Sequence, residues 1–394
     1  MAHSSDTHHV TAPCLPWHAA PAQVSALACA AQRGDDVQVA ALLTSGTVRL
    51  QEKHFALQLA AVNGHVACVR VIVGALSRNE LQNARHYGGP LELAAANGHE
   101  RIVNLLVARG GTDVLSLIVG CRAACAAARK GHCGVLAQFE RSVVPVCGTK
   151  YFDETAAHAA AESDQVQALA FMLQCKVQVD MQDRCGNRPL HRAAFRHAFR
   201  AAEYLLLHAK AAVNTPTWKG HETPLYVAAG REHAAPGREP SCFLQLLLQA
   251  KADVHADGGT RLPLHIAASR GLDSNVRLLL RANAQVAALD CNGLTPLAYA
   301  VNGHAPSTVR LLLHAKSSLN GAFAAAAFHR VHQVRRSGFV GSPLHLAVLL
   351  GAAAVVRVLL HAKADADAVD SAGWTPYDYA ADYCAEMVDA LRRR

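Results

Sequence analysis

Apolar residues recur along this chain in short stretches with one shared pattern, in which a proline and a leucine precede a pair of small residues. The clearest copies are TPLYVAA, TPLAYAV, LPLHIAA, RPLHRAA and SPLHLAV, which begin at Thr223, Thr295, Leu262, Arg188 and Ser342. Degenerate copies begin near residues 25, 55, 89, 122, 155 and 375, and the most frequent step between starts is 33 residues. A fixed period of this length indicates a repeat protein, in which each repeat is one supersecondary unit.

Each copy predicts a pair of helices joined by a tight turn. Proline at the second position suits the first turn of a helix, where its missing N–H costs nothing. After a Gly-His turn such as Gly64-His65, a second helix carries apolar runs such as the leucines at 205–207, which form a stripe that binds neighbouring layers. Asp290 and Gly293 exemplify the turn that joins one repeat to the next. Because no repeat buries its own apolar face, we expect stability to come from stacking.

The T-P-L-H-x-A pattern with a 33-residue period resembles the ankyrin repeat family, and the resemblance covers residues 22–394. It implies an all-α fold: an ankyrin-type α-solenoid of stacked helix-turn-helix repeats with connecting β-turns or hairpins. We expect residues 1–21 to be disordered and about eleven repeats to follow. Their starts lie near 25, 55, 89, 122, 155, 188, 223, 262, 295, 342 and 375, with insertions at 232–240 and 321–341. In the second insertion, one short amphipathic helix could include Phe323, Phe328, Val331 and Val334. The insertion is expected to be either an appended recognition element or a flexible loop.

The end of the second helix departs from the family pattern in the later repeats. The glycine of the pattern is present as Gly46 and Gly110. Later repeats replace it with residues that have a side chain, namely Lys176, Lys210, Lys251, Asn283, Lys316 and Lys363. A left-handed helix cap costs more for a residue with a Cβ, whereas a positive charge suits a helix C-terminus. We therefore expect strained but electrostatically favourable caps there.

Composition limits the classes of function. Hydrophobic residues make up 51% of the chain but aromatic residues only 5%, which favours thin alanine-lined layers over one large core. The net charge of +8 is too small to indicate nucleic-acid binding by itself. No apolar stretch reaches the ~20 residues of a membrane span, and the twelve cysteines contain no C-x-x-C pair. We expect a monomer in the cytoplasm, with the nucleus as the second possibility.

Candidate chemistry is sparse. The chain contains no Walker A, G-x-S-x-G, H-E-x-x-H or G-x-G-x-x-G motif, so we expect no enzyme and no cofactor. Eleven of the 23 histidines occupy fixed repeat positions, where the resemblance implies structural hydrogen bonds at layer junctions. One group, Cys121, Cys125, His132 and Cys133, has spacing that suits zinc. Because Cys125 and His132 also fall on repeat positions, we favour packing over metal binding for this group.

The resemblance places function on the concave face, which the first helices and the turn tips form. At the position just before the Gly-His turn, five of ten residues are basic, and four of these are concentrated in the middle of the array, namely Lys130, Arg196, Arg231 and Arg270. They predict a positive stripe that binds an acidic segment of a protein partner, with a solvated basic face as the alternative. The turn tips add further candidate contacts, namely Arg184, Trp218, Lys219, Arg261 and Trp374.

The sequence thus favours a non-catalytic scaffold or adaptor that holds a protein partner in its groove. The first alternative is the substrate-recognition subunit of a larger enzyme complex such as a ubiquitin ligase. A second is a metal- or redox-dependent protein built on the group at Cys121–Cys133. A third is nucleic-acid binding through the basic stripe, which we do not expect because the first helices lack aromatic stacking platforms.

Overall fold

The computed structural model describes residues 25–46, 48–77, 80, 89–110, 114–141, 154–218, 220–231, 241–256, 261–319, 323–324, 340–383 and 385–392. The chain divides into two compact units. Unit 1 comprises Met1–Ala127 and His132–Pro145, and unit 2 comprises Ala128–Gly131 and Val146–Arg394. The expected disorder of residues 1–21, the insertion at 232–240 and Lys219 lie outside the described residues.

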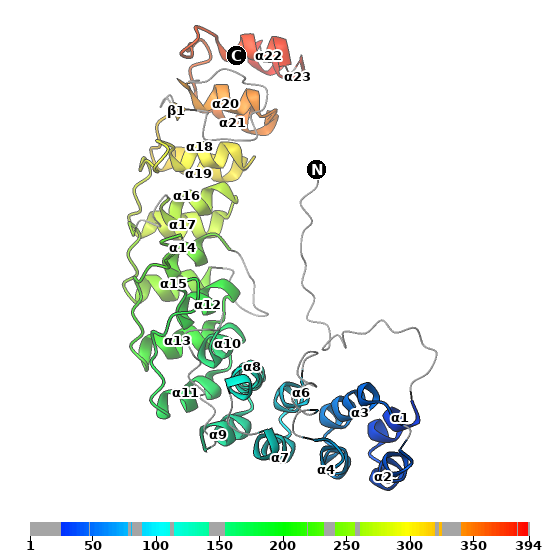
Figure 1. Cartoon of the computed structure of the whole chain (residues 1–394). Coiled ribbons are helices and arrows are strands. Elements are labelled where there is room, and N and C mark those ends of the chain that lie inside the picture. Colours follow the sequence, from blue (N-terminus) through cyan, green and yellow to red (C-terminus); the bar gives the residue numbers. More distant parts are fainter. Residues whose placement is uncertain are drawn as a thin grey trace. The chain divides into compact units, whose positions relative to one another are not determined.

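Unit 1 is built from short helices that stack in two rows (Figure 1). One row contains α1 (Ala26–Arg33), α3 (Leu50–Asn63) and α6 (Pro90–Ala96). The other contains α2 (Asp36–Thr44), α4 (Val66–Gly74), α7 (Glu100–Gly110) and α9 (Cys133–Arg141). Helix α8 (Val114–Lys130) carries the boundary between the units within its last turn.

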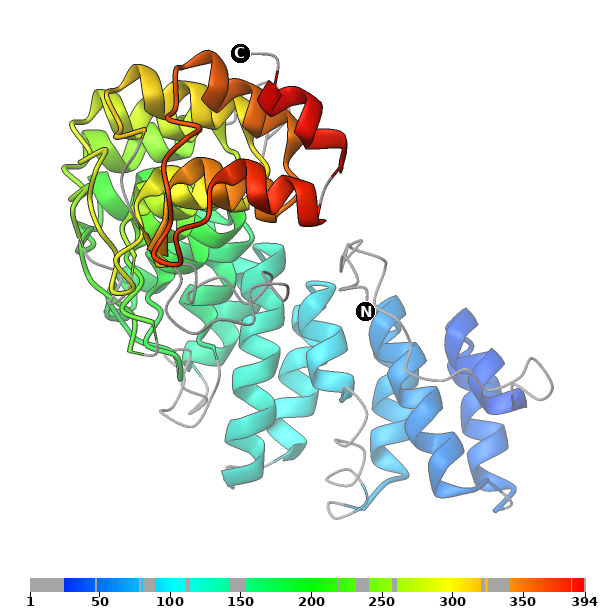
Figure 2. The same ribbon diagram turned by 90° about the horizontal axis from the view of Figure 1, so that it is seen from above.

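Unit 2 repeats the same two-row arrangement over more layers (Figures 1 and 2). Its first helices are α10 (Ala156–Glu162), α12 (Pro189–Arg196), α14 (Pro224–Ala229), α16 (Pro263–Ser269), α18 (Pro296–Asn302), α20 (Pro343–Leu349) and α22 (Pro376–Tyr383). Its second helices are α11 (Val166–Gln174), α13 (Phe199–Leu207), α15 (Cys242–Gln249), α17 (Asp273–Arg281), α19 (Pro306–His314), α21 (Ala353–His361) and α23 (Ala385–Arg392). First helices contact first helices and second helices contact second helices, so the expected all-α solenoid is confirmed.

Local rules explain where most helices begin. At Thr223 and Thr295 the hydroxyl oxygen accepts the backbone N–H three residues later, and proline follows as the first helical residue. Two first helices begin earlier than the pattern suggests: α3 at Leu50 rather than near 55, and α8 at Val114 rather than near 122. Neither start has a proline, and without one the preceding residues are free to be helical.

The core consists of thin layers. Paired alanines of the first helices, such as Ala267 and Ala268, are completely buried, as is Leu279 of the second-helix stripe. Only two aromatic residues, Phe139 and Phe243, rank among the largest fully buried side chains of the described residues. The layers are therefore held by close helix contact and leucine packing.

The insertion at 321–341 begins and ends in a two-stranded antiparallel pair, β1 (Phe323–Ala324) and β2 (Val340–Gly341). The hypothesis that Phe323 belongs to an amphipathic helix is therefore wrong, because Phe323 pairs with Gly341 through the backbone. The residues at 325–339 lie outside the part of the chain that the structure describes.

The strained helix caps expected in the later repeats are present. Lys176, Lys210, Lys251, Lys316 and Lys363 all have positive φ, between 54° and 67°, and Asn283 has φ 63°. Gly46 of unit 1 has φ 70°, so the same left-handed geometry is formed there without a Cβ. Among the described helices, none has both the length and the apolar character needed to cross a bilayer.

Candidate partner-binding surface

Buried histidines join consecutive layers of unit 2. They occupy the third position of a first helix and are at most 2% exposed, namely His158, His191, His265 and His345. In each ring, Nδ1 accepts a backbone N–H at the start of its own helix, as from Leu262 to His265 at 3.2 Å. The Nε2 atom bonds a carbonyl in the turn of the next repeat, as from His265 to Leu294 at 3.0 Å. The expectation of structural histidines at layer junctions is confirmed for these four.

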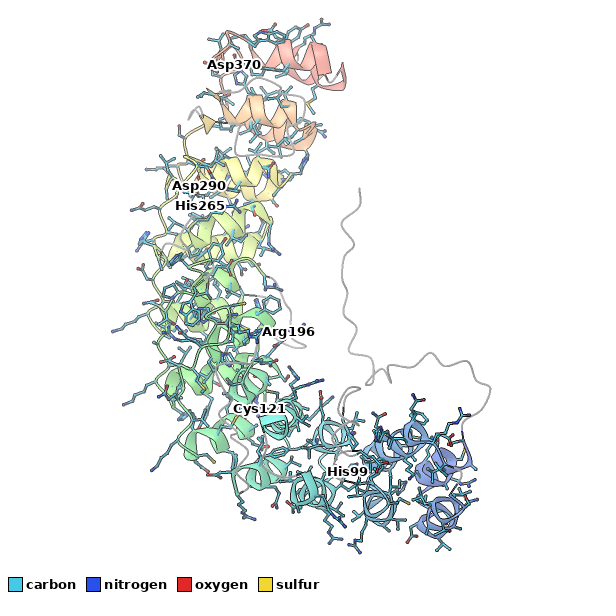
Figure 3. All side chains as sticks on the ribbon, viewed as in Figure 1. His99, Cys121, Arg196, His265, Asp290 and Asp370 are labelled. Atoms are coloured by element: carbon cyan, nitrogen blue, oxygen red, sulfur yellow. The ribbon has the colours of Figure 1, made fainter. Side chains whose placement is uncertain are left out.

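The turns that receive these bonds share an aspartate. Asp290 Oδ1 accepts the backbone N–H groups of Asn292 and Leu294 at 2.9 and 2.8 Å, and Asp183 and Asp370 form the same pattern. Burial alone raises the pKa of the Asp370 carboxyl, but hydrogen bonds, above all from the Tyr379 hydroxyl, outweigh this and lower it. Figure 3 shows Asp290 and Asp370 along the side of unit 2 where the turns run. These groups are therefore committed to the framework.

Unit 1 joins its layers through the histidines of the Gly-His turns. The Nε2 atoms of His65, His99 and His132 bond carbonyls of the preceding repeat at 2.9–3.1 Å. Each ring lies against the glycine of the preceding Gly-His turn or its equivalent, and a Cβ placed on Gly98 would lie 2.8 Å from Nδ1 of His132. These rings are half-buried, and His99 is labelled in Figure 3.

Three of the four residues whose spacing suits zinc have structural surroundings. Cys121 and Cys125 are buried, and the His132 ring is engaged with Gly98 and the carbonyl of Ala96. Within the described residues, no three His, Cys, Asp or Glu side chains are grouped so that they could hold a metal ion.

The basic residues of the first helices differ in whether their charge is already balanced. Arg196 Nε lies 2.9 Å from Glu162 Oε1. Arg192, one turn earlier in α12, lies 2.7 Å from Asp183 Oδ2. Lys130 is exposed at the end of α8. Among these residues, Arg192 and Arg196 are thus partly neutralised from within the protein.

Arg231 and Arg270 line a pocket of about 270 Å³. Helices α12, α14 and α16 and the residues next to their ends supply its walls, among them Arg192, Phe195, Glu222, Val227, Arg231, Ile266 and Arg270. In the part of the chain that the structure describes, no carboxylate lies within ion-pair distance of either arginine. Burial, followed by the nearby charges of Arg270 and Arg196, lowers the pKa of Arg231, and Glu222 opposes the shift. The pocket is therefore positively charged.

Phe195 forms part of this pocket and corrects one sequence-based inference. Its ring is 38% exposed, and the guanidinium carbon of Arg231 lies 3.5 Å from the ring centroid. The first helices therefore do present an aromatic platform. The signal was available in the sequence, because Phe195 immediately precedes Arg196, but its pairing with Arg231 depends on the contact between layers.

Asn275 is a second residue that the sequence did not single out. It lies in α17, is 1% exposed, and donates from Nδ2 to the carbonyls of Ala229 at 3.2 Å and Arg231 at 3.0 Å. These hydrogen bonds hold the backbone at the end of α14 and at Arg231. Asn275 Oδ1 is buried and accepts no hydrogen bond from the described residues.

The turn-tip candidates divide into exposed and packed residues. Trp218 is 61% exposed and lies against Gly186, and Arg184 is also exposed. Trp374 is half-buried, with its ring 5.2 Å from that of Tyr379. The guanidinium of Arg261 lies 4.8 Å above the ring of Tyr299. Trp218 and Arg184 are thus more exposed than Trp374 and Arg261.

The stacked helix pairs, the aspartate turns and the histidine joints define a helical repeat solenoid. Family models described as ankyrin repeats (3 copies) match residues 27–117 and 232–322, and models described as ankyrin repeats (many copies) match 157–206 and 331–380. These ranges cover most of the chain. The chain belongs to the ankyrin repeat family.

Known proteins and solved structures are similar to parts of this chain. The human ankyrin repeat and SOCS box protein 16 is 33% identical over 177 residues, which cover 36% of this chain and 39% of that protein. The crystal structure of the human ASB11 ankyrin repeat domain superposes with a TM-score of 0.50 and 23% identity, covering 61% of this chain and 97% of that one. The ankyrin repeat domain of Bcl-3 gives 0.48 and 24%, covering 61% and 99%.

Membership of this family has a general functional meaning. Ankyrin repeats indicate a protein–protein interaction scaffold, and proteins built from them are generally non-enzymatic interaction modules. The framework positions described above are committed to packing, which leaves the exposed side chains of the first helices and turns as the candidates for partner contact.

Proposed function

We propose that this protein is a scaffold or adaptor that binds an acidic segment of a protein partner through the basic residues of the unit 2 first helices. The observation that carries the proposal is the pair Arg231 and Arg270, which share a pocket without an ion-pair partner among the described residues. Charged groups of this kind steer and orient a ligand of opposite charge. Trp218 and Arg184 at the turn tips extend the proposed contact surface.

An affinity pull-down with mass spectrometry tests this proposal. The bait is the full chain, compared with a variant in which Lys130, Arg196, Arg231 and Arg270 are changed to Glu. The expected result is the loss of a set of proteins with acidic segments from the variant. Parallel cytosolic and nuclear extracts show which compartment supplies the preys, and so test the proposed cytoplasmic location.

A matched control has the same charge change on the second helices. Arg200, Arg277, Arg310 and Arg357 are exposed on α13, α17, α19 and α21, and their change to Glu should leave the prey set intact. Both variants must keep the helical circular dichroism of the unmodified chain. Equal loss of preys from both variants, or from neither, contradicts binding at the first helices.

The second candidate function is the substrate-recognition subunit of a ubiquitin ligase. It is favoured by the similarity to the human ankyrin repeat and SOCS box protein 16, which spans 39% of that protein. Stable co-purification of ligase core subunits with the full chain would support it. Preys that contain no ligase subunit in any extract would leave the scaffold function in place and remove this candidate.

A further inference from the structure

We propose that the pocket formed by α12, α14 and α16 binds one Asp or Glu side chain of the partner together with the apolar side chain next to it. Arg231 and Arg270 receive the carboxylate, and Val227 and Ile266 contact the apolar neighbour. This inference rests on the proposed function and sharpens it, because it replaces a diffuse charged stripe with one specific subsite.

The distribution of ion pairs localises the subsite. Arg192 and Arg196 already contact Asp183 and Glu162, so an incoming carboxylate gains less there. Arg231 and Arg270 have no such contact among the described residues, and both line the same pocket. The position that a Cβ on Gly230 would occupy lies 2.7 Å from Ile266 Cγ1 and 3.8 Å from Arg270 Nε, so an aliphatic side chain and a guanidinium lie close together beside Gly230.

The stack of Arg231 on Phe195 orients the guanidinium. With the guanidinium carbon 3.5 Å from the ring centroid, the cation is held by the ring quadrupole. A guanidinium in a fixed plane offers parallel N–H groups that match the two oxygens of a carboxylate. The half-exposed ring also adds apolar surface beside that carboxylate.

Asn275 acts as a positioning residue for Arg231. The third residue of the other second helices in unit 2 is Ala168, Ala201, Leu244, Thr308, Val355 or Met387, according to the helix. Only α17 among those seven helices has an amide there, and its Nδ2 donates to the carbonyl of Arg231. The buried oxygen of the Asn275 side chain accepts no hydrogen bond from the described residues, which costs stability. The positioning of Arg231 explains why an amide stands there in spite of this cost.

The size of the pocket decides the kind of occupant. About 270 Å³ lies below the ~300–1,000 Å³ of small-molecule sites and has room for one or two side chains. The walls combine Arg231 and Arg270 with the paired Arg192, the carboxylate of Glu222 and aliphatic side chains. An acidic residue adjacent to an apolar one therefore fits better than a run of acidic residues, which Glu222 would repel.

Selection from a phage library of random peptides on the full chain tests the proposal. Enriched sequences should carry Glu or Asp next to Leu, Ile, Val, Met or Phe. A synthetic copy of the dominant peptide with an amidated C-terminus should bind, and its Glu→Gln version should bind about ten- to a hundredfold more weakly. Enrichment without an acidic residue overturns the proposal. So does a peptide whose binding requires a free terminal carboxylate.

Paired variants separate this inference from the proposed function. Arg231→Met with Arg270→Met should weaken the peptide about tenfold or more, whereas Lys130→Met with Arg196→Met should change it less than about twofold. Equal effects of the two pairs overturn the single subsite but leave the acidic groove in place. No effect of either pair overturns both.

The role of Asn275 has its own readout. Asn275→Ala should lower the ratio of affinities for the Glu and Gln peptides while leaving the affinity for the Gln peptide unchanged. A purely structural role would lower both affinities alike, and that result overturns the positioning role.

Discussion

The two units join their layers with the same chemistry in opposite directions. In unit 1, His65, His99 and His132 reach back to a carbonyl of the preceding repeat across a bare glycine. In unit 2, histidines such as His265 reach forward to the turn of the following repeat. The unit 1 rings are half-buried, whereas the unit 2 rings are at most 2% exposed. Burial therefore makes the joints of unit 2 the costlier ones to break.

The largest expected effect comes from removing a buried ring. His265→Ala leaves the N–H of Leu262 and the carbonyl of Leu294 without the ring that bonds them, and opens a cavity. We expect a loss of about 3 kcal/mol in the free energy of unfolding, measured by urea denaturation. The matched change His99→Ala in unit 1 should cost about 1 kcal/mol because solvent replaces its partner. Equal losses in the free energy of unfolding would show that burial does not make the unit 2 histidine contribute more than the unit 1 histidine.

The second-largest expected effect is a loss of stability of unit 2 in acid. Burial lowers the pKa of His158, His265 and His345, and it lowers the pKa of His191 to about 4. Because the unfolded histidines bind protons near pH 6.5 and the folded ones do not, stability falls as pH decreases from about 6.5 toward 4. His191 alone should contribute a loss of about 2 kcal/mol at pH 5.

Hydrogen exchange at pH 7 and pH 5 checks where this loss occurs. The fall in protection, after correction for the slower intrinsic exchange at pH 5, should be concentrated in α10, α12, α16 and α20 and the turns that follow them. His191→Gln, which cannot become charged, should reduce the difference between the two pH values. A loss confined to unit 1 would contradict the assignment to the buried rings.

A third change breaks a joint of unit 1. Gly98→Ala forces a Cβ into His132 and places alanine at φ 75°, so we expect a loss of about 2 kcal/mol in urea denaturation. Gly46→Ala is the control, since its φ is 70° but nothing lies within 4 Å of the added Cβ. It should cost about 1 kcal/mol, and an equal cost at both sites would remove the role of the ring contact.

The smallest effect should be a gain. Lys363→Gly relieves the left-handed cap at φ 64° and gives unit 2 the residue that unit 1 has at Gly46. We expect about 0.5 kcal/mol of added stability, seen as a higher urea midpoint. Lys363→Ala removes the charge but keeps the Cβ and should give no gain. A similar gain from both would assign the effect to charge.

Features governed by local rules could be predicted from the sequence. The repeat period, the proline-started helices and the left-handed lysine caps each depend on residues within one repeat. The early starts of α3 and α8 could not, because proline was missing where the pattern placed the boundary. The pairing of Arg196 with Glu162 and of Asn275 with Arg231 joins residues 34 and 44 positions apart. Such contacts depend on how layers stack, which no single repeat encodes.

The forward-reaching joints of unit 2 also decide where this chain can be cut. A fragment that ends at Met181 contains every helix of the repeat that starts near 155, yet it removes Asn187, whose carbonyl bonds the buried ring of His158. A fragment extended through the turn at 183–187 keeps that acceptor. A cut placed at the end of a sequence repeat therefore separates the last buried histidine from its acceptor in the next turn. Deletion boundaries in unit 2 should lie after that turn.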